Sequence, residues 1–162
     1  MPDAICNTSP LQYLHQLGLL HLLPALLKRV IVPPAVADEI AVGKKAGVSL
    51  PDLEALDWVA IRRPASESAL PLITDLGPGE TEVLMLALEL RGSVAVLDDD
   101  LARRVAETLR VRFMGTLGVL LDAKRAGLIP KVTPLLDQLD ALRFRLAPHT
   151  RAAVLKLAGE ES

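Results

Sequence analysis

The sequence predicts an α/β fold in which helices cover both faces of a parallel sheet, and three observations lead to this prediction. Short apolar runs typical of buried strands alternate along the chain with longer segments of helical periodicity. Hydrophobic residues make up 51% of the 162 residues, which is enough for a sizeable core. Pro and Gly punctuate the segments in the way expected where helices begin and end.

The first half of the chain alternates predicted strands and helices. The expected elements are a strand at 4–7, a helix opened by Ser9 and Pro10, a short helix at 20–27, a strand at 30–33 and a helix from Pro34 to Gly43. Ser9 is predicted to be the N-cap of its helix and Gly18 to end it. A loop at 44–50, a short helix at 51–56 and a strand at 58–62 complete this half.

The second half continues the alternation after an irregular segment at 64–78. The expected elements are a helix between Gly77 and Gly92, a strand at 94–97, a helix at 101–109, a strand at 111–114, a helix at 117–126 and two further helices at 133–143 and 148–158. We expect one domain over residues 1–162. Its core would cover about 4–130, and a C-terminal helical extension would cover about 131–158.

Several protein classes are excluded by the composition. A membrane span needs about 20 consecutive apolar residues, and the sequence has no such stretch. The opening residues lack a basic segment followed by a long apolar core, so we expect no secretory signal. The single cysteine, Cys6, lies in an apolar run and is predicted to be a small core residue. These features predict a cytoplasmic protein without a membrane partner.

Charge is distributed unevenly along the chain. The net charge is −2, but residues 101–158 contain eleven Lys and Arg against four Asp and Glu, which gives +7. The rest of the chain therefore carries −9. An acidic group beside a basic flank suits a metal-assisted enzyme that acts on a polyanion.

Three consecutive acids, Asp98 to Asp100, follow the predicted strand at 94–97. Ligands of open α/β sheets gather beyond the carboxyl ends of the strands, so the triplet lies where a site is expected. Like charges repel one another more strongly near a low-dielectric interior. The repulsion must therefore be offset by protonation, by basic neighbours or by a bound cation.

Other oxygen-bearing side chains are predicted to reach the same region. Glu80 shares the apolar face of its helix, whereas Glu82 is predicted to face solvent. Glu39 adjoins the apolar positions of its own helix, and Asn7 ends the first strand. Together with Asp98 these residues offer the oxygen ligands that Mg²⁺ or Mn²⁺ prefers.

Five sequence blocks, taken in order, resemble the PIN-domain nucleases, which include the VapC-type toxins of toxin–antitoxin pairs. The blocks are NTSPLQYLHQLGLLHLL, VIVPPAVADEI, LGPGETEVLMLALEL, AVLDDDLARRVAETL and VRFMGTLGVLLDAKRAGLI. They cover about residues 4–130 and are most similar to a PIN-like subgroup. The resemblance implies a three-layer α/β/α sandwich, a four-acid metal site and hydrolysis of RNA phosphodiester bonds.

The resemblance implies a role for each acidic position. Asn7 occupies the position of the first acid, Glu39 that of the second and Glu80 that of the third. The fourth falls within the triplet, where Asp98 is favoured and Asp99 is next, and Asp99 is also expected to bind a second metal or to support the metal ligands. An amide oxygen at position 7 can coordinate a cation but brings no charge and cannot act as a base.

The resemblance also implies supporting residues and partners. Ser9 matches the hydroxyl residue that supports the first acid, and Asp100 and Thr116 are expected at the rim. The basic residues expected to hold the RNA backbone are Arg103, Arg104, Lys124 and Arg125. Expected protein partners are an antitoxin and a second copy of the chain.

Three functional hypotheses follow from these features. The first is a Mg²⁺- or Mn²⁺-dependent endoribonuclease, which includes the toxin of a toxin–antitoxin pair. The second, motivated by Asn7, is a catalytically inactive PIN-like module that binds a protein or RNA. The third is a phosphotransfer or receiver-like domain, and VRFMGT lacks the lysine expected after a late strand of that class.

Overall fold

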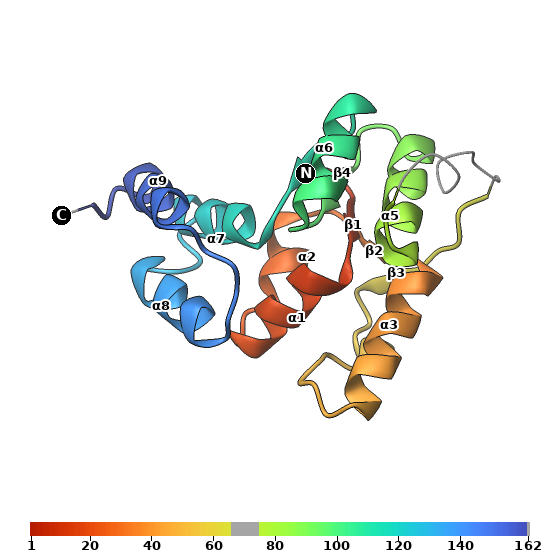
Figure 1. Cartoon of the computed structure of the whole chain (residues 1–162), viewed down its shortest axis with the longest axis horizontal. Coiled ribbons are helices and arrows are strands. Elements are labelled where there is room, and N and C mark those ends of the chain that lie inside the picture. Colours follow the sequence, from red (N-terminus) through yellow and green to blue (C-terminus); the bar gives the residue numbers. More distant parts are fainter. Residues whose placement is uncertain (66–74, 162) are drawn as a thin grey trace.

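The computed structural model describes residues 1–65 and 75–161 and contains a parallel five-stranded sheet (Figure 1). The strands are β1 (Ala4–Cys6), β2 (Val30–Val32), β3 (Val59–Ile61), β4 (Val94–Val96) and β5 (Phe113–Met114). Their order across the sheet is β3-β2-β1-β4-β5. The chain moves outward from β1 in one direction and then returns to the other side of it. The carboxyl ends of β1 and β4 are therefore neighbours at the centre of the sheet.

Helices cover both faces of the sheet. They are α1 (Thr8–Gln16), α2 (Leu22–Leu26), α3 (Pro34–Lys45), α5 (Pro78–Glu89), α6 (Asp100–Thr108), α7 (Thr116–Arg125), α8 (Thr133–Ala141) and α9 (Pro148–Ala158), with a 3₁₀ turn at Leu53–Ala55. Helix α5 packs against β1 and β4, while α1 and α2 pack against α7. In Figure 1 the strands β1 and β2 lie between α1 and α2 on one side and α5 on the other. The predicted α/β/α sandwich with extra C-terminal helices is confirmed.

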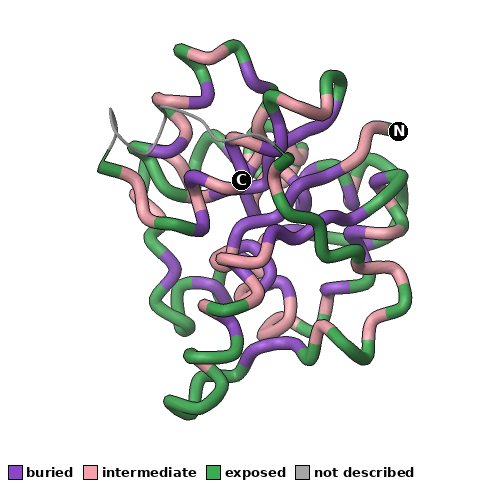
Figure 2. The backbone as a smooth tube through the Cα atoms, turned by 90° about the vertical axis from the view of Figure 1, so that its right-hand side faces the viewer, coloured by how far each residue is buried: buried purple, intermediate pink, exposed green. Residues whose placement is uncertain are grey.

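The central strands of the sheet consist of apolar residues and are buried. Every residue of β1, β2 and β4 is buried, as expected of parallel strands with helices on both faces. Figure 2 shows these buried segments running through the middle of the molecule. Cys6 is buried within β1, as predicted, and burial raises the pKa of its thiol to about 12.

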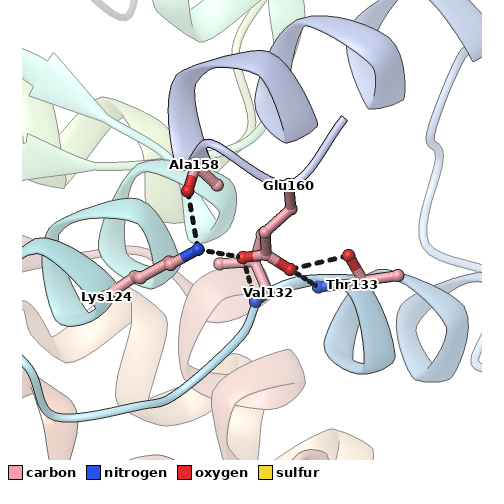
Figure 3. Close-up of polar contacts among 5 residues, drawn as sticks. All are labelled: Lys124, Val132, Thr133, Ala158 and Glu160. Atoms are coloured by element: carbon pink, nitrogen blue, oxygen red, sulfur yellow. Dashed lines mark hydrogen bonds and ion pairs between the residues drawn. The ribbon is translucent and has the colours of Figure 1, made fainter. Parts of the chain in front are cut away.

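The C-terminal helices are fastened to α7 by a polar cluster around Glu160 (Figure 3). Glu160 accepts hydrogen bonds from the backbone N–H groups of Val132 and Thr133 at the start of α8, and from the Thr133 hydroxyl. Lys124 of α7 donates to Glu160 and to the carbonyl of Ala158 at the end of α9. Burial disfavours the charged carboxylate, but these hydrogen bonds outweigh it and lower the pKa of Glu160 to about 2.

Some predicted boundaries were wrong. Helix α1 begins at Thr8 instead of after Ser9, and its N-cap is Asn7, whose side chain makes no capping hydrogen bond. Helix α3 continues past Gly43 to Lys45, and Gly43 makes room there for Leu50, whose Cδ1 would lie 2.5 Å from a Cβ at this position. The predicted irregular segment 64–78 lies partly outside the described residues. Within 1–65 and 75–161, no helix has both the length and the apolar character that crossing a membrane requires.

Candidate functional site

The candidate site lies where β1 and β4 end beside each other. Cys6 pairs with Val96 in the sheet, and the N–H of Asn7 donates to the carbonyl of Val96 at 3.0 Å. Asn7 and Asp98 therefore leave the sheet at the same edge. Helix α1 begins directly after Asn7, so its first turn lies over this edge.

Asp98 is held by three hydrogen bonds at the carboxyl end of β4. The Ser9 hydroxyl donates to its Oδ2 at 2.9 Å, and Thr116 donates its backbone N–H to Oδ1 and its hydroxyl to Oδ2, both at 2.8 Å. Gly115 leaves room for this carboxylate, because a Cβ there would lie 2.8 Å from Oδ1. The Asp98 charge thus lies at the N-terminus of α7, which stabilises an anion.

Glu39 is held in a similar way on the other side of α1. The Thr8 hydroxyl donates to its Oε2 at 2.6 Å, and the backbone N–H of Gly79 donates to its Oε1 at 3.2 Å. A Cβ on Gly79 would lie 2.7 and 2.8 Å from the two carboxylate oxygens. Glu39 therefore occupies the space beside the N-terminus of α5 that only glycine leaves open.

Two adjacent hydroxyl residues thus anchor two acids that are distant in sequence. Thr8 binds Glu39, 31 positions away, and Ser9 binds Asp98, 89 positions away. Because consecutive residues hold them, the two carboxylates both lie close to the first turn of α1. The structure brings these two predicted site residues to one edge of the sheet.

Asn7, which directly precedes these two anchors, is buried with an unsatisfied oxygen. Its side chain is only 3% exposed, and its Oδ1 has no hydrogen-bond partner among the described residues. A buried amide oxygen without a partner is destabilising and is rare in native proteins. The oxygen is thus available to an added donor or cation at this position.

Glu80 follows Gly79 in the first turn of α5 and is partly exposed. Its Oε2 lies near Gly77, where a Cβ would come within 2.8 Å, so the side chain folds over the start of its own helix. Among residues 1–65 and 75–161 it has no hydrogen-bond partner. The structure places its backbone beside the Glu39 anchor, because Gly79, the residue before it, donates its N–H to Glu39.

Glu82 corrects a prediction. It was expected to face solvent, but its side chain is partly buried and accepts a 2.9 Å hydrogen bond from the N–H of Ala35 at the start of α3. Sequence periodicity does not reveal this contact, because the donor belongs to a helix 47 positions away. Glu82 joins α5 to α3, and these helices pack together.

The three consecutive acids separate as soon as α6 begins. Asp98 points toward the site, whereas Asp99 is the N-cap of α6 and accepts from the N–H of Ala102 at 2.9 Å. Asp100 is exposed in the first turn of that helix. Hydrogen-bond donors and helix N-termini thus offset the charges of Asp98 and Asp99.

The described side chains do not form a closed ligand shell. Across residues 1–65 and 75–161, no three of the His, Cys, Asp and Glu side chains are grouped as metal ligands. The site consists instead of two anchored acids, a buried amide and Glu80 at the rim. All four offer oxygen atoms, the donor type that hard divalent cations select.

The four predicted RNA-binding residues have different surroundings. The Arg103 guanidinium lies over the Phe113 ring, 5.1 Å from its centroid, and Arg104 is exposed on the same helix. Arg125 forms an exposed pair with Asp122 at 3.5 Å. Lys124 differs from the others, because its ammonium is bound to Glu160 at 2.7 Å. Its charge serves the C-terminal cluster.

Sequence reasoning missed the residues that shape the acidic pair. Thr8, Gly79 and Gly115 were not predicted to belong to the site, although each contacts or makes room for Glu39 or Asp98. One signal was available for the glycines. Gly79 lies in the first turn of α5 and Gly115 is the N-cap of α7, and at the start of a helix a backbone N–H can meet a carboxylate.

Comparison with known proteins finds one family model that matches this sequence. A family model described as a PIN domain matches residues 3–160, which is nearly the whole chain. No curated protein matches the sequence.

Proposed function

The chain belongs to the PIN-domain family, whose members are generally nucleases, and on this premise we propose that it is a metal-dependent endoribonuclease. The observation that carries the proposal is the edge where β1 and β4 end. There, hydroxyls of α1 hold Glu39 and Asp98, and the residue before them, Asn7, has a buried amide oxygen without a partner in the described part of the chain.

The donor set fits a hard divalent cation. In our proposal Glu39, Glu80 and Asp98 would hold Mg²⁺ or Mn²⁺, and Asn7 Oδ1 would be a neutral ligand. The unsatisfied state of that oxygen supports its assignment, since a cation would supply the partner that the protein lacks. When bound, the cation would stabilise negative charge on the phosphate oxygens.

The residues around the proposed cation have separate roles. Ser9 and Thr116 fix the Asp98 carboxylate, while Thr8 and Gly79 fix that of Glu39. Glu80 has no hydrogen-bond partner among the described residues, so its carboxylate would be available to the cation and would help to orient an attacking water. Asp99 supports the site by capping α6.

The RNA backbone would be held by exposed arginines of α6 and α7. Arg104 is exposed on α6, which begins two residues after Asp98, whereas Arg103 of the same helix lies against the Phe113 ring. Arg125 lies at the end of α7 and is exposed. We leave Lys124 out of this set because its ammonium is bound to Glu160 and Ala158.

A cleavage assay with two variants of α5 tests the proposal. Wild-type protein should cleave members of an RNA panel in Mn²⁺, and Glu80→Gln should reduce the rate by about a hundredfold or more. The control Glu82→Gln keeps an oxygen for the Ala35 N–H and should retain the rate. Equal cleavage by wild type and Glu80→Gln would contradict the assignment.

A second function, a catalytically inactive PIN-like module that binds RNA or a protein, is favoured by one observation. Asn7 places a neutral amide where the family pattern has an acid, which lowers the negative charge of the site. Calorimetry with Mn²⁺ separates the two functions. Saturable binding at one site supports the nuclease, and absence of binding at millimolar Mn²⁺ supports the inactive module.

A toxin role would add protein partners to this activity. We propose the C-terminal helices as the surface for a second copy of the chain or for an antitoxin, because Leu142 and Leu157 are exposed there. Light scattering tests the dimer. A monomer at all concentrations would rule it out, and Leu157→Glu should weaken a dimer that uses α9.

A further inference from the structure

A charged hollow lies beside the candidate site on one face of α6. It has a volume of about 500 Å³ and is lined by Asp100, Arg103, Arg104, Glu107 and Phe113. The four charged residues recur at i, i+3, i+4 and i+7 of the helix, so they share a face, while Ala102 and Ala106 on the other face are buried. The hollow is broad and open to solvent.

The hollow adjoins the acidic pair through two chain segments. Asp100 is two residues from Asp98, and Phe113 is two residues from Gly115, which makes room for that carboxylate. A ligand in the hollow would therefore lie next to a strand bound at Glu39 and Asp98. This relation rests on the proposed function.

The charged groups of the hollow do not neutralise one another by contact. Among residues 1–65 and 75–161, the side chains of Asp100, Arg103, Arg104 and Glu107 form no ion pair or hydrogen bond. The Nε of Arg103 is buried without a partner. The Phe113 ring holds the Arg103 guanidinium in place. Because no other side chain of the described residues binds it, the Arg103 guanidinium keeps its terminal N–H groups for an added acceptor.

The balance of charges argues for a base and against a phosphate. Two carboxylates beside two guanidiniums give the hollow no net charge, so it has little attraction for a dianion. It does present donors and acceptors side by side over an aromatic ring. Guanine matches this pattern, since arginine binds its O6 and N7 and a carboxylate accepts from its N–H groups. In the major-groove code only guanine presents two adjacent acceptors to one arginine, and uracil also has no amino group for the carboxylates.

We propose that this hollow binds a guanine base of the RNA substrate. Arg103 donates to the acceptor edge of the base, Asp100 or Glu107 accepts from its N–H groups, and Phe113 keeps the Arg103 guanidinium in position. The base is unpaired, because its hydrogen-bonding edges must both be accessible. The hollow thereby sets which phosphodiester bond reaches the acidic pair.

Binding of free nucleotides tests the hollow without any cleavage. Nucleoside monophosphates have no internucleotide bond, so GMP and UMP can be titrated in Mg²⁺ and followed by NMR of the Phe113 ring. Both carry the same phosphate, and their affinity ratio therefore reports the base. We expect GMP to bind about tenfold more tightly than UMP. Equal affinities, or no binding of GMP, would overturn the proposal.

A conservative variant assigns the preference to one side chain. Arg103→Lys keeps the positive charge but loses the planar fork of donors, so the GMP preference should disappear. The control is Arg91→Lys, an exposed arginine just beyond the end of α5, which should leave the preference unchanged. A preference that survives Arg103→Lys would contradict the assignment.

A cleavage map identifies RNA as the source of the base. Uridine-rich RNA with one guanosine should be cut at a fixed distance from that guanosine by wild type, and at scattered positions by Arg103→Lys. Random cleavage by wild type would overturn the assignment to RNA. The two proposals fail separately. If the protein cleaves RNA but shows no preference for GMP, only the guanine site is contradicted. If it prefers GMP but cleaves no RNA, only the nuclease proposal is contradicted.

Discussion

The Ser9 hydroxyl donates a 2.9 Å hydrogen bond to Oδ2 of Asp98, across 89 positions of the sequence. The bond joins the first turn of α1 to the carboxyl end of β4. Its neighbour Thr8 makes the corresponding bond to Glu39 of α3. One dipeptide therefore sets the positions of two acids, and α1 begins by orienting side chains of other elements in place of capping itself.

Loss of either hydroxyl that binds Asp98 should loosen this carboxylate. We expect Ser9→Ala and Thr116→Val each to weaken Mn²⁺ binding by about tenfold, because groups that orient a metal ligand contribute about 10–100-fold to affinity. Calorimetry measures the change. Thr108→Val is the control, since its hydroxyl bonds only to Arg104 of the same helix. Unchanged Mn²⁺ affinity in both site variants would contradict a role in metal binding.

Gly79 should tolerate no side chain if Glu39 is to keep its position. A Cβ would lie 2.7 and 2.8 Å from the Glu39 oxygens, which end a flexible side chain and can swing away. We expect Gly79→Ala to keep its melting temperature but to lose at least about tenfold in Mn²⁺ affinity. Gly118→Ala is the matched helical control, because its Cβ would contact only Met114, at 3.4 Å.

Glu160 should make stability depend on pH in the acidic range. Its pKa is lowered from 4.5 to about 2, so the folded state favours the carboxylate. The stabilisation is fully present above pH 4.5 and is lost as the pH falls through about 2. Urea denaturation of wild type and Glu160→Gln should show a difference in unfolding free energy that shrinks over this window. A constant difference would indicate that the ionisation of Glu160 is not involved.

The Cys6 thiol should be inert in the folded protein. It lies in the central strand β1, and burial raises its pKa to about 12, so almost no thiolate forms at neutral pH. Iodoacetamide should label the chain only after denaturant is added, as mass spectrometry can follow. Rapid labelling without denaturant would show that β1 opens readily.

The fold could be predicted because its signals are local. Apolar runs mark β1, β2 and β4, and proline marks the start of α3 and α5. Ligand sites of parallel sheets lie at the carboxyl ends of the strands, and this rule predicted that Asn7 and Asp98 lie at one edge of the sheet. Such rules need only the residues of one helix or strand, or the order of the elements along the chain.

The contacts that build the site were harder to predict because they join distant residues. Serine is a common N-cap residue, and only the folded structure shows that the Ser9 hydroxyl binds Asp98 instead. The helical periodicity of the sequence predicts that Glu82 faces solvent, yet its carboxylate accepts a hydrogen bond from the N–H of Ala35 at the start of α3. Capping preferences describe what a side chain can do for its own helix, and they carry no information about a better donor or acceptor elsewhere.

Asn7→Asp provides the sharpest test of the site, because it changes one buried group. The Asn7 side chain is 3% exposed and its Oδ1 has no partner in the described part of the chain. An aspartate there would bury a carboxylate without a donor, so we expect it to destabilise the cation-free protein by roughly 2 kcal/mol or more. Mn²⁺ should reverse this loss, since a carboxylate binds the cation more strongly than an amide does.

Melting temperatures in EDTA and in Mn²⁺ check this expectation. Asn7→Asp should melt below wild type in EDTA and gain more than wild type from Mn²⁺, because a ligand that binds only the folded state stabilises it. Asn7→Ala is the control: it removes the unsatisfied oxygen, so it should be at least as stable as wild type in EDTA and should respond least to Mn²⁺. If Asn7→Asp gains no more from Mn²⁺ than Asn7→Ala does, the buried oxygen does not face the cation, and the site must be centred elsewhere.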